Sequence, residues 1–443
     1  MQQDANGFAL STASEPAARA YDATIDSYLT YRLDTPLKLK AALAEDPEFG
    51  LLHVLKGSFA LLSYKQASVP AARAAHEAAE RFTVSATARE RAHVAALGAW
   101  VDDRMDRALA VWEAILAEHP QDILAFRLHH FCAFWTGRAD RMLSAAEGVM
   151  PRWHAEVPHW GAVLACRAFA NEECGNYSVA ELAAREAIAL DPGNLWAVHA
   201  LAHVMEMQGR RGEGIATLER LRPHFEGKNN LLHHVLWHQA LYHLERREWD
   251  AVLALYDHGF RDLASPVTQL QPDLYIDMQN AASMLFRLER CGVDVGTRWE
   301  ELAEKAEARI GDCRSAFTLP HWMMALCATG RLAAAERMLA AMRGNAVSVI
   351  SRIALPVSDA VLLHARGDHA GALAAMRPVL GEMHLLGGSH AQQDVLEQLF
   401  LDAAMKAGAA DDARLLLERV AGRCPVPPER RIGYRDAAGA ALH

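Results

Sequence analysis

A repeated spacing of glycine, alanine and proline constrains this chain more than any other feature. Two segments, starting at Gly175 and Gly408, have an alanine five residues and a proline seventeen residues after the glycine. A third segment starts at Asp103, where aspartate takes the place of glycine, and the first half of the spacing recurs at Gly330 and Gly367. Glycine permits a tight turn between two helices, alanine lets the helices approach closely, and proline ends the second helix. The spacing therefore predicts a series of antiparallel helix pairs.

The interval between repeats indicates which kind of helix pair this is. Gly175 and Gly209 are 34 residues apart, and so are Asp103 and Gly137. This is the period of the tetratricopeptide repeat (TPR). Apolar residues between these positions are spaced by three and four, and we find no convincing strand. We expect an all-α fold, a TPR-like α-solenoid in which helix-turn-helix repeats stack into a right-handed superhelix with a concave groove.

No shift in composition marks a linker, so we expect a single TPR-like superhelical domain over residues 1–425. The predicted repeats lie near 89–122, 123–160, 161–194, 195–232, 233–270, 316–352, 353–393 and 394–425. Residues 426–443 are expected to form a loosely attached C-terminal tail.

Charge and cysteine content exclude several classes of function. The chain has 45 Lys plus Arg against 55 Asp plus Glu, a formal net charge of −10, so we expect no nucleic acid and no membrane surface as partners. Seven cysteines without a C-x-x-C pair indicate neither a disulfide framework nor a cysteine zinc site. The N-terminal residues lack the pattern of a signal peptide, and no apolar run approaches the ~20 residues of a membrane span. These features predict a cytoplasmic protein.

Four strings of residues resemble a known family. They are HALAHVMEMQGR (199–210), HHVLWHQALYHLE (233–245) with a later LYD (255–257), SMLFRLERCGVDVGTRW (283–299) and GGSHAQQDV (387–395). Over nearly the whole chain, from about Ala13 to Arg430, the sequence is similar to the tetratricopeptide repeat protein 38 family. The resemblance implies the all-α repeat architecture and brings no reaction with it.

Histidine is concentrated in one part of the chain. Seven of the 22 histidines lie between His199 and His243. At about 100° per residue, His199, His203 and Glu206 fall in one narrow stripe of a helix, at positions that we expect to face the groove. The first helix of the next repeat carries His234 and His238, again four residues apart. Because neighbouring helices lie roughly 8–10 Å apart, imidazoles from both could meet at one point.

Three interpretations of this histidine cluster compete. The first is a site for zinc, manganese or iron, with His199, His203 and His238 as ligands. The second is a metal-free acid/base site in which Glu206 tunes His203 or His238. The third is a buried polar core in which the histidines hydrogen-bond between stacked helices.

Further candidates are chosen by their place in the repeats. Ser389 and Gln392 form a predicted capping box, which accounts for these two residues. It does not account for His390, which is a substrate-binding candidate, or for Asp394, which is a catalytic candidate. Glu172 lies 34 residues before Glu206, at the equivalent repeat position. The remaining substrate-binding candidates are His234 and three residues that could wall a pocket or add an acid: Trp160, Trp237 and Asp277.

Two classes of function follow from these patterns. The first is an enzyme that binds a small molecule in the groove and hydrolyses it with the help of a metal or a histidine; its catalytic residues are His199, His203, Glu206, His238 and Asp394. The alternative is a non-catalytic TPR module that binds a peptide or a partner protein. Peptide grooves of TPR arrays tend to be lined by Asn, Lys and Arg, whereas this cluster offers His and Glu, which favours the small molecule. A homo-oligomer is compatible with both.

Overall fold

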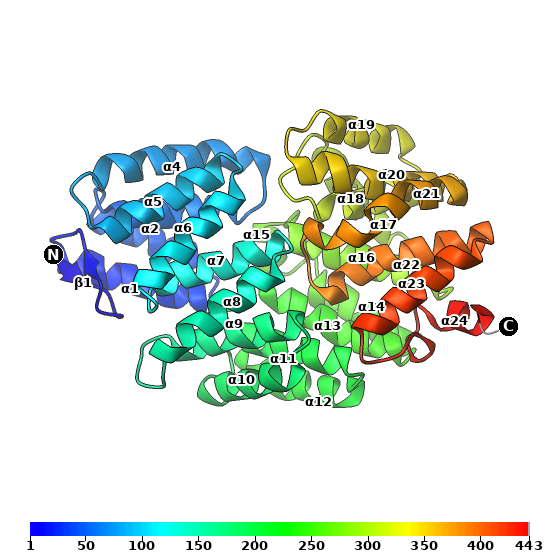
Figure 1. The fold of residues 1–443 in the computed structure, drawn as a ribbon, viewed down its shortest axis with the longest axis horizontal. Coiled ribbons are helices and arrows are strands. Elements are labelled where there is room, and N and C mark those ends of the chain that lie inside the picture. The colour runs from blue at the N-terminus through cyan, green and yellow to red at the C-terminus, as the bar shows by residue number, and fades with distance from the viewer. Residues whose placement is uncertain (442–443) are drawn as a thin grey trace. The chain divides into compact units, whose positions relative to one another are not determined.

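A computed structural model describes residues 1–441 and shows helices joined by short turns (Figure 1). The only paired strands among these residues are β1 (Gln2–Gln3) and β2 (Ala9–Leu10), which form a short antiparallel hairpin that the sequence did not predict. Most helices pack against the helix before and the helix after them in the chain, as expected for stacked helix pairs. The fold is all-α, a TPR-like α-solenoid, as predicted.

The turn inside each helix pair has the backbone conformation that the sequence indicates. The predicted turn glycines all have φ between 66° and 81°; they are Gly137, Gly175, Gly209, Gly330, Gly367 and Gly408. Asp103 takes the same left-handed conformation, with φ 57°, and so does Arg247, with φ 60°. This conformation is strained for residues with a Cβ, and aspartate tolerates it better than most. Arg247 therefore marks a turn that the glycine pattern could not reveal.

Contacts divide the described residues into two compact units. Unit 1 comprises Met1–Leu201 and Leu221–Leu231. Its helices are α1 (Glu15–Leu29), α2 (Thr35–Glu45), α3 (Gly50–Leu61), α4 (Val69–Phe82), α5 (Ala88–Val101), α6 (Met105–Glu118), α7 (Ile123–Trp135), α8 (Ala139–Val149), α9 (Trp160–Glu173) and α10 (Tyr177–Leu190). Helix α11 (Leu195–Met207) is continuous across the boundary between the units.

Unit 2 comprises Ala202–Arg220 and the described residues from Leu232 onward. Its helices are α12 (Arg211–Leu221), α13 (Leu231–Glu245), α14 (Trp249–Leu255), α15 (Pro266–Leu270), α16 (Tyr275–Arg290), α17 (Arg298–Ala308), α18 (Thr318–Ala328), α19 (Leu332–Arg343), α20 (Leu355–Ala365), α21 (His369–Met376), α22 (His390–Ala407), α23 (Ala410–Arg423) and α24 (Arg435–Ala441). A division of this kind is compatible with one continuous solenoid, so the single domain over residues 1–425 stays a prediction.

The C-terminal segment is bound more firmly than expected. Arg431 and Tyr434 both hydrogen-bond to Asp394 on α22, and Tyr434 is only 1% exposed. The expectation of a loosely attached tail is therefore wrong for this segment, because a buried carboxylate holds it to unit 2. No helix among the described residues is long and apolar enough to cross a membrane.

Candidate functional site

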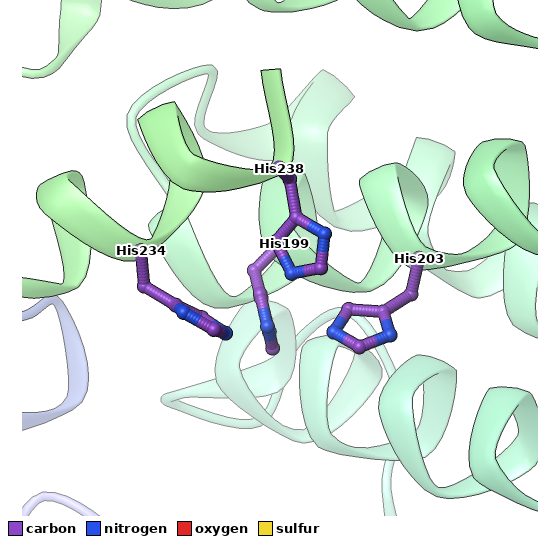
Figure 2. Close-up of side chains that lie close together, drawn as sticks. All are labelled: His199, His203, His234 and His238. Atoms are coloured by element: carbon purple, nitrogen blue, oxygen red, sulfur yellow. The ribbon is translucent and has the colours of Figure 1, made fainter. Parts of the chain in front are cut away.

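Three buried histidines of unit 2 lie together on two helices (Figure 2). Helix α13 supplies His234 and His238, and α11 supplies His203. One ring nitrogen of each of these histidines lies within 4.8 Å of a ring nitrogen of the others. Each residue is at most 2% exposed. His199 lies one turn before His203, on the part of α11 that belongs to unit 1. We call His203, His234 and His238 the histidine cluster.

Two of these rings are fixed by a partner on their Nδ1 edge. Nδ1 of His234 donates to Oδ1 of Asn280 on α16, at 2.9 Å. Nδ1 of His238 lies 2.7 Å from Oε2 of Glu206, on α11. An outer acceptor of this kind orients the ring and holds the ring proton on Nδ1, so that Nε2 would be the ligating nitrogen; for His238 this requires that the facing oxygen of Glu206 carries no proton. This is the arrangement found around histidines that bind metals.

Burial keeps the cluster uncharged. It lowers the pKa of His203 and of His234 well below the usual value, and it lowers the pKa of His238 to about 3, with nearby Arg287 acting in the same direction. Burial also raises the pKa of Glu206 to about 8, although Arg287 opposes this shift. The imidazoles are therefore neutral at pH 7, which is the form that ligates a metal.

A polar cavity of about 40 Å³ lies in unit 2, and Glu206 forms part of its wall. Four arginines line it: Arg211, Arg287, Arg423 and Arg431. Three carboxylates line it as well: Glu206, Glu245 and Asp394. Since Glu206 also contacts His238, one side chain connects this cavity, which we call the arginine cavity, to the histidine cluster.

Asp394 is the centre of the charged network around the arginine cavity. Its carboxylate accepts hydrogen bonds from Nη2 of Arg287 at 3.2 Å and from Nε2 of Gln398 at 2.6 Å, and also from Arg431 and Tyr434. Burial opposes ionisation, but the two guanidinium groups lower the pKa of Asp394 below its usual range. Asp394 is thus a permanently charged group that holds the wall of the cavity.

Other predicted residues in unit 2 take different places. The Trp237 ring stacks on His234, with ring centroids 5.2 Å apart and an interplanar angle of 12°. His390 is the first residue of α22 and lines the arginine cavity, next to the predicted capping box of Ser389, which is confirmed. Asp277 instead lies 3.1 Å from Nδ1 of His233, so it belongs to a separate pair.

Two predicted substrate-binding residues lie in unit 1. Glu172 is fully buried on α9. Trp160, the first residue of the same helix, is half-buried and donates from Nε1 to Glu186 at 3.3 Å. Neither residue lines the arginine cavity.

Sequence analysis missed the residues that connect the cluster to its surroundings. Asn280 and Arg287 lie on α16, and Arg423 and Arg431 lie near the C-terminus. One signal was available: Arg287 stands among the apolar residues Met284, Leu285 and Leu288, on the buried side of its helix. A buried arginine requires a compensating partner and therefore indicates a charged network. The partner itself, Asp394, is 107 residues away in the chain.

The helix pairs and their left-handed turns define the chain as a TPR-type helical repeat protein. No family model matches the sequence. Among solved structures, it is similar to yeast Tom70, with a TM-score of 0.40 and 11% sequence identity over 96% of this chain and 86% of that one. It is also similar to a chain in the structure of Naa15/Naa10 bound to HypK-THB, with a TM-score of 0.26 and 14% identity over 91% of this chain and 68% of that one. Both similarities are remote, and the repeat class rests on the helix pairs themselves.

Proposed function

We propose that this TPR-type protein binds one divalent transition-metal ion at the histidine cluster and acts on a small molecule in the arginine cavity. The observation that carries the proposal is the convergence of His203, His234 and His238, two of which have their Nδ1 edge fixed by an oxygen of Glu206 or Asn280. A buried polar core would need each imidazole to be hydrogen-bonded, but it would not need the rings to meet at one point.

The donor set suits a transition metal. Neutral imidazole is a ligand for zinc, iron and manganese, and three imidazoles would leave the fourth position of a tetrahedral zinc ion open to water. Iron or manganese with a larger coordination number would retain positions for water and substrate. His234 is added to two ligands expected from the sequence, His203 and His238, because it lies one turn before His238 on α13. The third expected ligand, His199, lies in unit 1.

Hydrolysis of the small molecule is the reaction that this arrangement suits best. A bound metal would supply an activated water, and Glu206 is placed to hold a proton between His238 and the arginine cavity. We also propose that the chain belongs to the tetratricopeptide repeat protein 38 family and works in the cytoplasm. The four strings of shared residues and the free cysteines support these two assignments.

Zinc titration of chelator-treated protein, in competition with a chromophoric chelator, tests the metal site. The wild-type protein should bind zinc with about one-to-one stoichiometry, and His238→Gln should lower the affinity by about 100-fold or more, since removal of an outer partner alone costs about 10–100-fold. His364→Gln is the matched control, because His364 is a half-buried histidine of unit 2 that pairs with Asp402 outside the cluster. Equal zinc affinity in all three proteins would overturn the proposal.

The reaction is tested with a panel of small esters and amides. Turnover should require the metal-loaded protein and should be lost in His238→Gln but kept in His364→Gln. Turnover that is the same in the metal-free protein would exclude metal assistance.

A further inference from the structure

We propose that the arginine cavity binds the carboxylate group of a small organic acid with a short alkyl chain. The inference deepens the proposed function, on which it rests for the reaction, by naming the class of ligand. It depends on three properties of the cavity: its charge, its unpaired donors and its size.

The charge of the cavity favours an anion. Four arginines against three carboxylates leave a formal excess of one positive charge in the lining. Burial raises the pKa of Glu245, which favours its neutral form and reduces the negative charge of the lining. Arg211, whose Nη2 lies 2.9 Å from Oε2 of Glu245, opposes this shift. In a site of low dielectric, an unbalanced positive charge is costly, and an anionic ligand removes that cost.

Two buried nitrogens of the lining make no hydrogen bond to any other described residue: Nε of Arg423, which is always a donor, and Nδ1 of His390, which is a donor in one of the two neutral tautomers. Arg423 uses Nη2 to bind Oε2 of Glu397 at 2.6 Å, but its Nε has no partner. Nδ1 of His390 has none either. Buried polar atoms are nearly always paired, so these two nitrogens indicate an acceptor that the protein itself does not supply. A carboxylate has two acceptor oxygens and can satisfy both.

The volume of the arginine cavity and its apolar lining limit the kinds of anion that could bind there. A volume of 40 Å³ corresponds to roughly three water positions at ~10–15 Å³ each, which the three non-hydrogen atoms of a carboxylate group would fill, so the alkyl chain would have to extend beyond them along the lining. Leu241, Leu244, Val426 and Ile432 add an apolar wall that suits a short alkyl chain. A phosphate dianion would bring two negative charges close to Asp394 and Glu245 and would leave this apolar wall unused.

The position of the cavity connects this ligand to the histidine cluster. Glu206 lines the cavity and also contacts His238. A bound organic acid would therefore lie one side chain away from the cluster, within the same unit.

Calorimetric titration of the metal-free protein tests the inference. The probes are acetate, propionate and butyrate, with acetamide as a neutral analogue and inorganic phosphate as the competing anion. The carboxylates should bind with affinity that increases with chain length until the cavity is full, acetamide should bind at least about 10-fold more weakly, and phosphate should bind more weakly than butyrate.

Two variants of α23 form a matched pair. Arg419 and Arg423 both pair with Glu397, through contacts of 3.4 Å and 2.6 Å, but only Arg423 lines the cavity. Arg423→Gln should weaken butyrate binding by about 10-fold or more, as expected for a charged hydrogen bond, and Arg419→Gln should change it by less than about two-fold. His390→Phe, which removes the second donor but keeps a ring, gives an independent check if Arg423→Gln does not fold; it should weaken binding several-fold.

The inference is wrong if Arg423→Gln and Arg419→Gln bind butyrate equally, if His390→Phe binds it as the wild type does, or if acetamide or phosphate binds as tightly as the carboxylates. Because the titration uses metal-free protein, it can fail while zinc still binds, and zinc binding can fail while the carboxylates still bind. The two failures are therefore distinguishable.

Discussion

Units 1 and 2 both bury histidines in stacked helices, but the buried rings have different partners in the two units. In unit 1, His93 contacts Asp122 at 2.9 Å and His129 contacts Glu113 at 3.0 Å, so each ring has its own carboxylate. His130 is packed among Phe126, Phe169 and Trp196. In unit 2, the rings of His203, His234 and His238 meet one another instead.

This difference shows which property of a histidine indicates function. Burial alone does not, because His93 and His130 are as deeply buried as His203. Convergence of several rings, with Nδ1 of His234 and of His238 held by an outer oxygen, is what separates the cluster from the unit 1 histidines.

The largest effect should come from one buried, arginine-paired carboxylate in each unit. Asp122 contacts Arg89 and His93 in unit 1, and Asp394 binds Arg287 and Arg431 in unit 2. Asp122→Asn and Asp394→Asn should each lower the free energy of unfolding by about 3–5 kcal/mol, because each leaves a buried charge uncompensated. Urea unfolding measures this loss.

Only one of these two variants should affect ligand binding. Asp394→Asn changes the wall of the arginine cavity and should alter butyrate affinity at a temperature where both variants are folded. An equal change in Asp122→Asn would mean that the network in unit 2 has no special relation to the ligand.

A second effect is the loss of stability in acid. Burial opposes ionisation of both carboxylates, but the pKa of each is lowered in the folded protein. His93 and Arg89 lower the pKa of Asp122. Arg431 and Arg287 lower the pKa of Asp394. A carboxylate whose pKa is lowered by folding stabilises the folded protein at pH values above its unfolded-state pKa of about 3.9. This stabilisation is lost as the pH falls toward the folded-state pKa. Each carboxylate should contribute on the order of 2 kcal/mol, which disappears between about pH 5 and pH 2.

Unfolding by urea at several pH values between about pH 5 and pH 2 measures this slope. Each asparagine variant should show a shallower slope than the wild type. If both slopes match the wild type, these carboxylates are not the groups that titrate.

A smaller effect should come from the outer partners of the histidines. Asn280→Ala removes the acceptor of His234 and should lower zinc affinity by about 10–100-fold, which corresponds to roughly 1.4–2.7 kcal/mol. Glu113→Gln changes the partner of His129 in unit 1 and should leave zinc affinity unchanged. If both variants reduce zinc binding equally, the contrast between the two units fails.

The smallest effect should be the same in both units. Asp103 and Arg247 are exposed residues in the left-handed conformation. Asp103→Gly in unit 1 and Arg247→Gly in unit 2 should each stabilise the protein by about 0.5–1 kcal/mol, because glycine adopts this conformation without strain. Thermal unfolding detects the gain, and a loss of stability would show that the side chain makes a contact of greater value.

Most of the fold could be predicted because the turn inside each repeat is determined by residues close to it in the sequence. A glycine such as Gly175 or Gly408 sets the backbone conformation of its own turn, so a short sequence segment is enough to identify a helix pair. Arg247 shows the limit of this approach, because a left-handed turn at arginine leaves no trace in residue type.

The site could be predicted only in part. The spacing of four residues placed His199 with His203 and His234 with His238, since a helix puts such residues on one face. His234 was expected to take a role in substrate binding, whereas its ring lies with those of His203 and His238. Asn280, Arg287 and Arg431 reach the site from helices and segments far along the chain, and no local pattern encodes that approach.

Elemental analysis of the protein purified without an affinity tag and without chelators tests the metal site most directly. We expect about one transition-metal ion per chain in the wild-type protein and in Glu113→Gln, and strong depletion in His238→Gln. A wild-type protein that contains no transition metal and takes up no equivalent of added zinc, manganese or iron would contradict it.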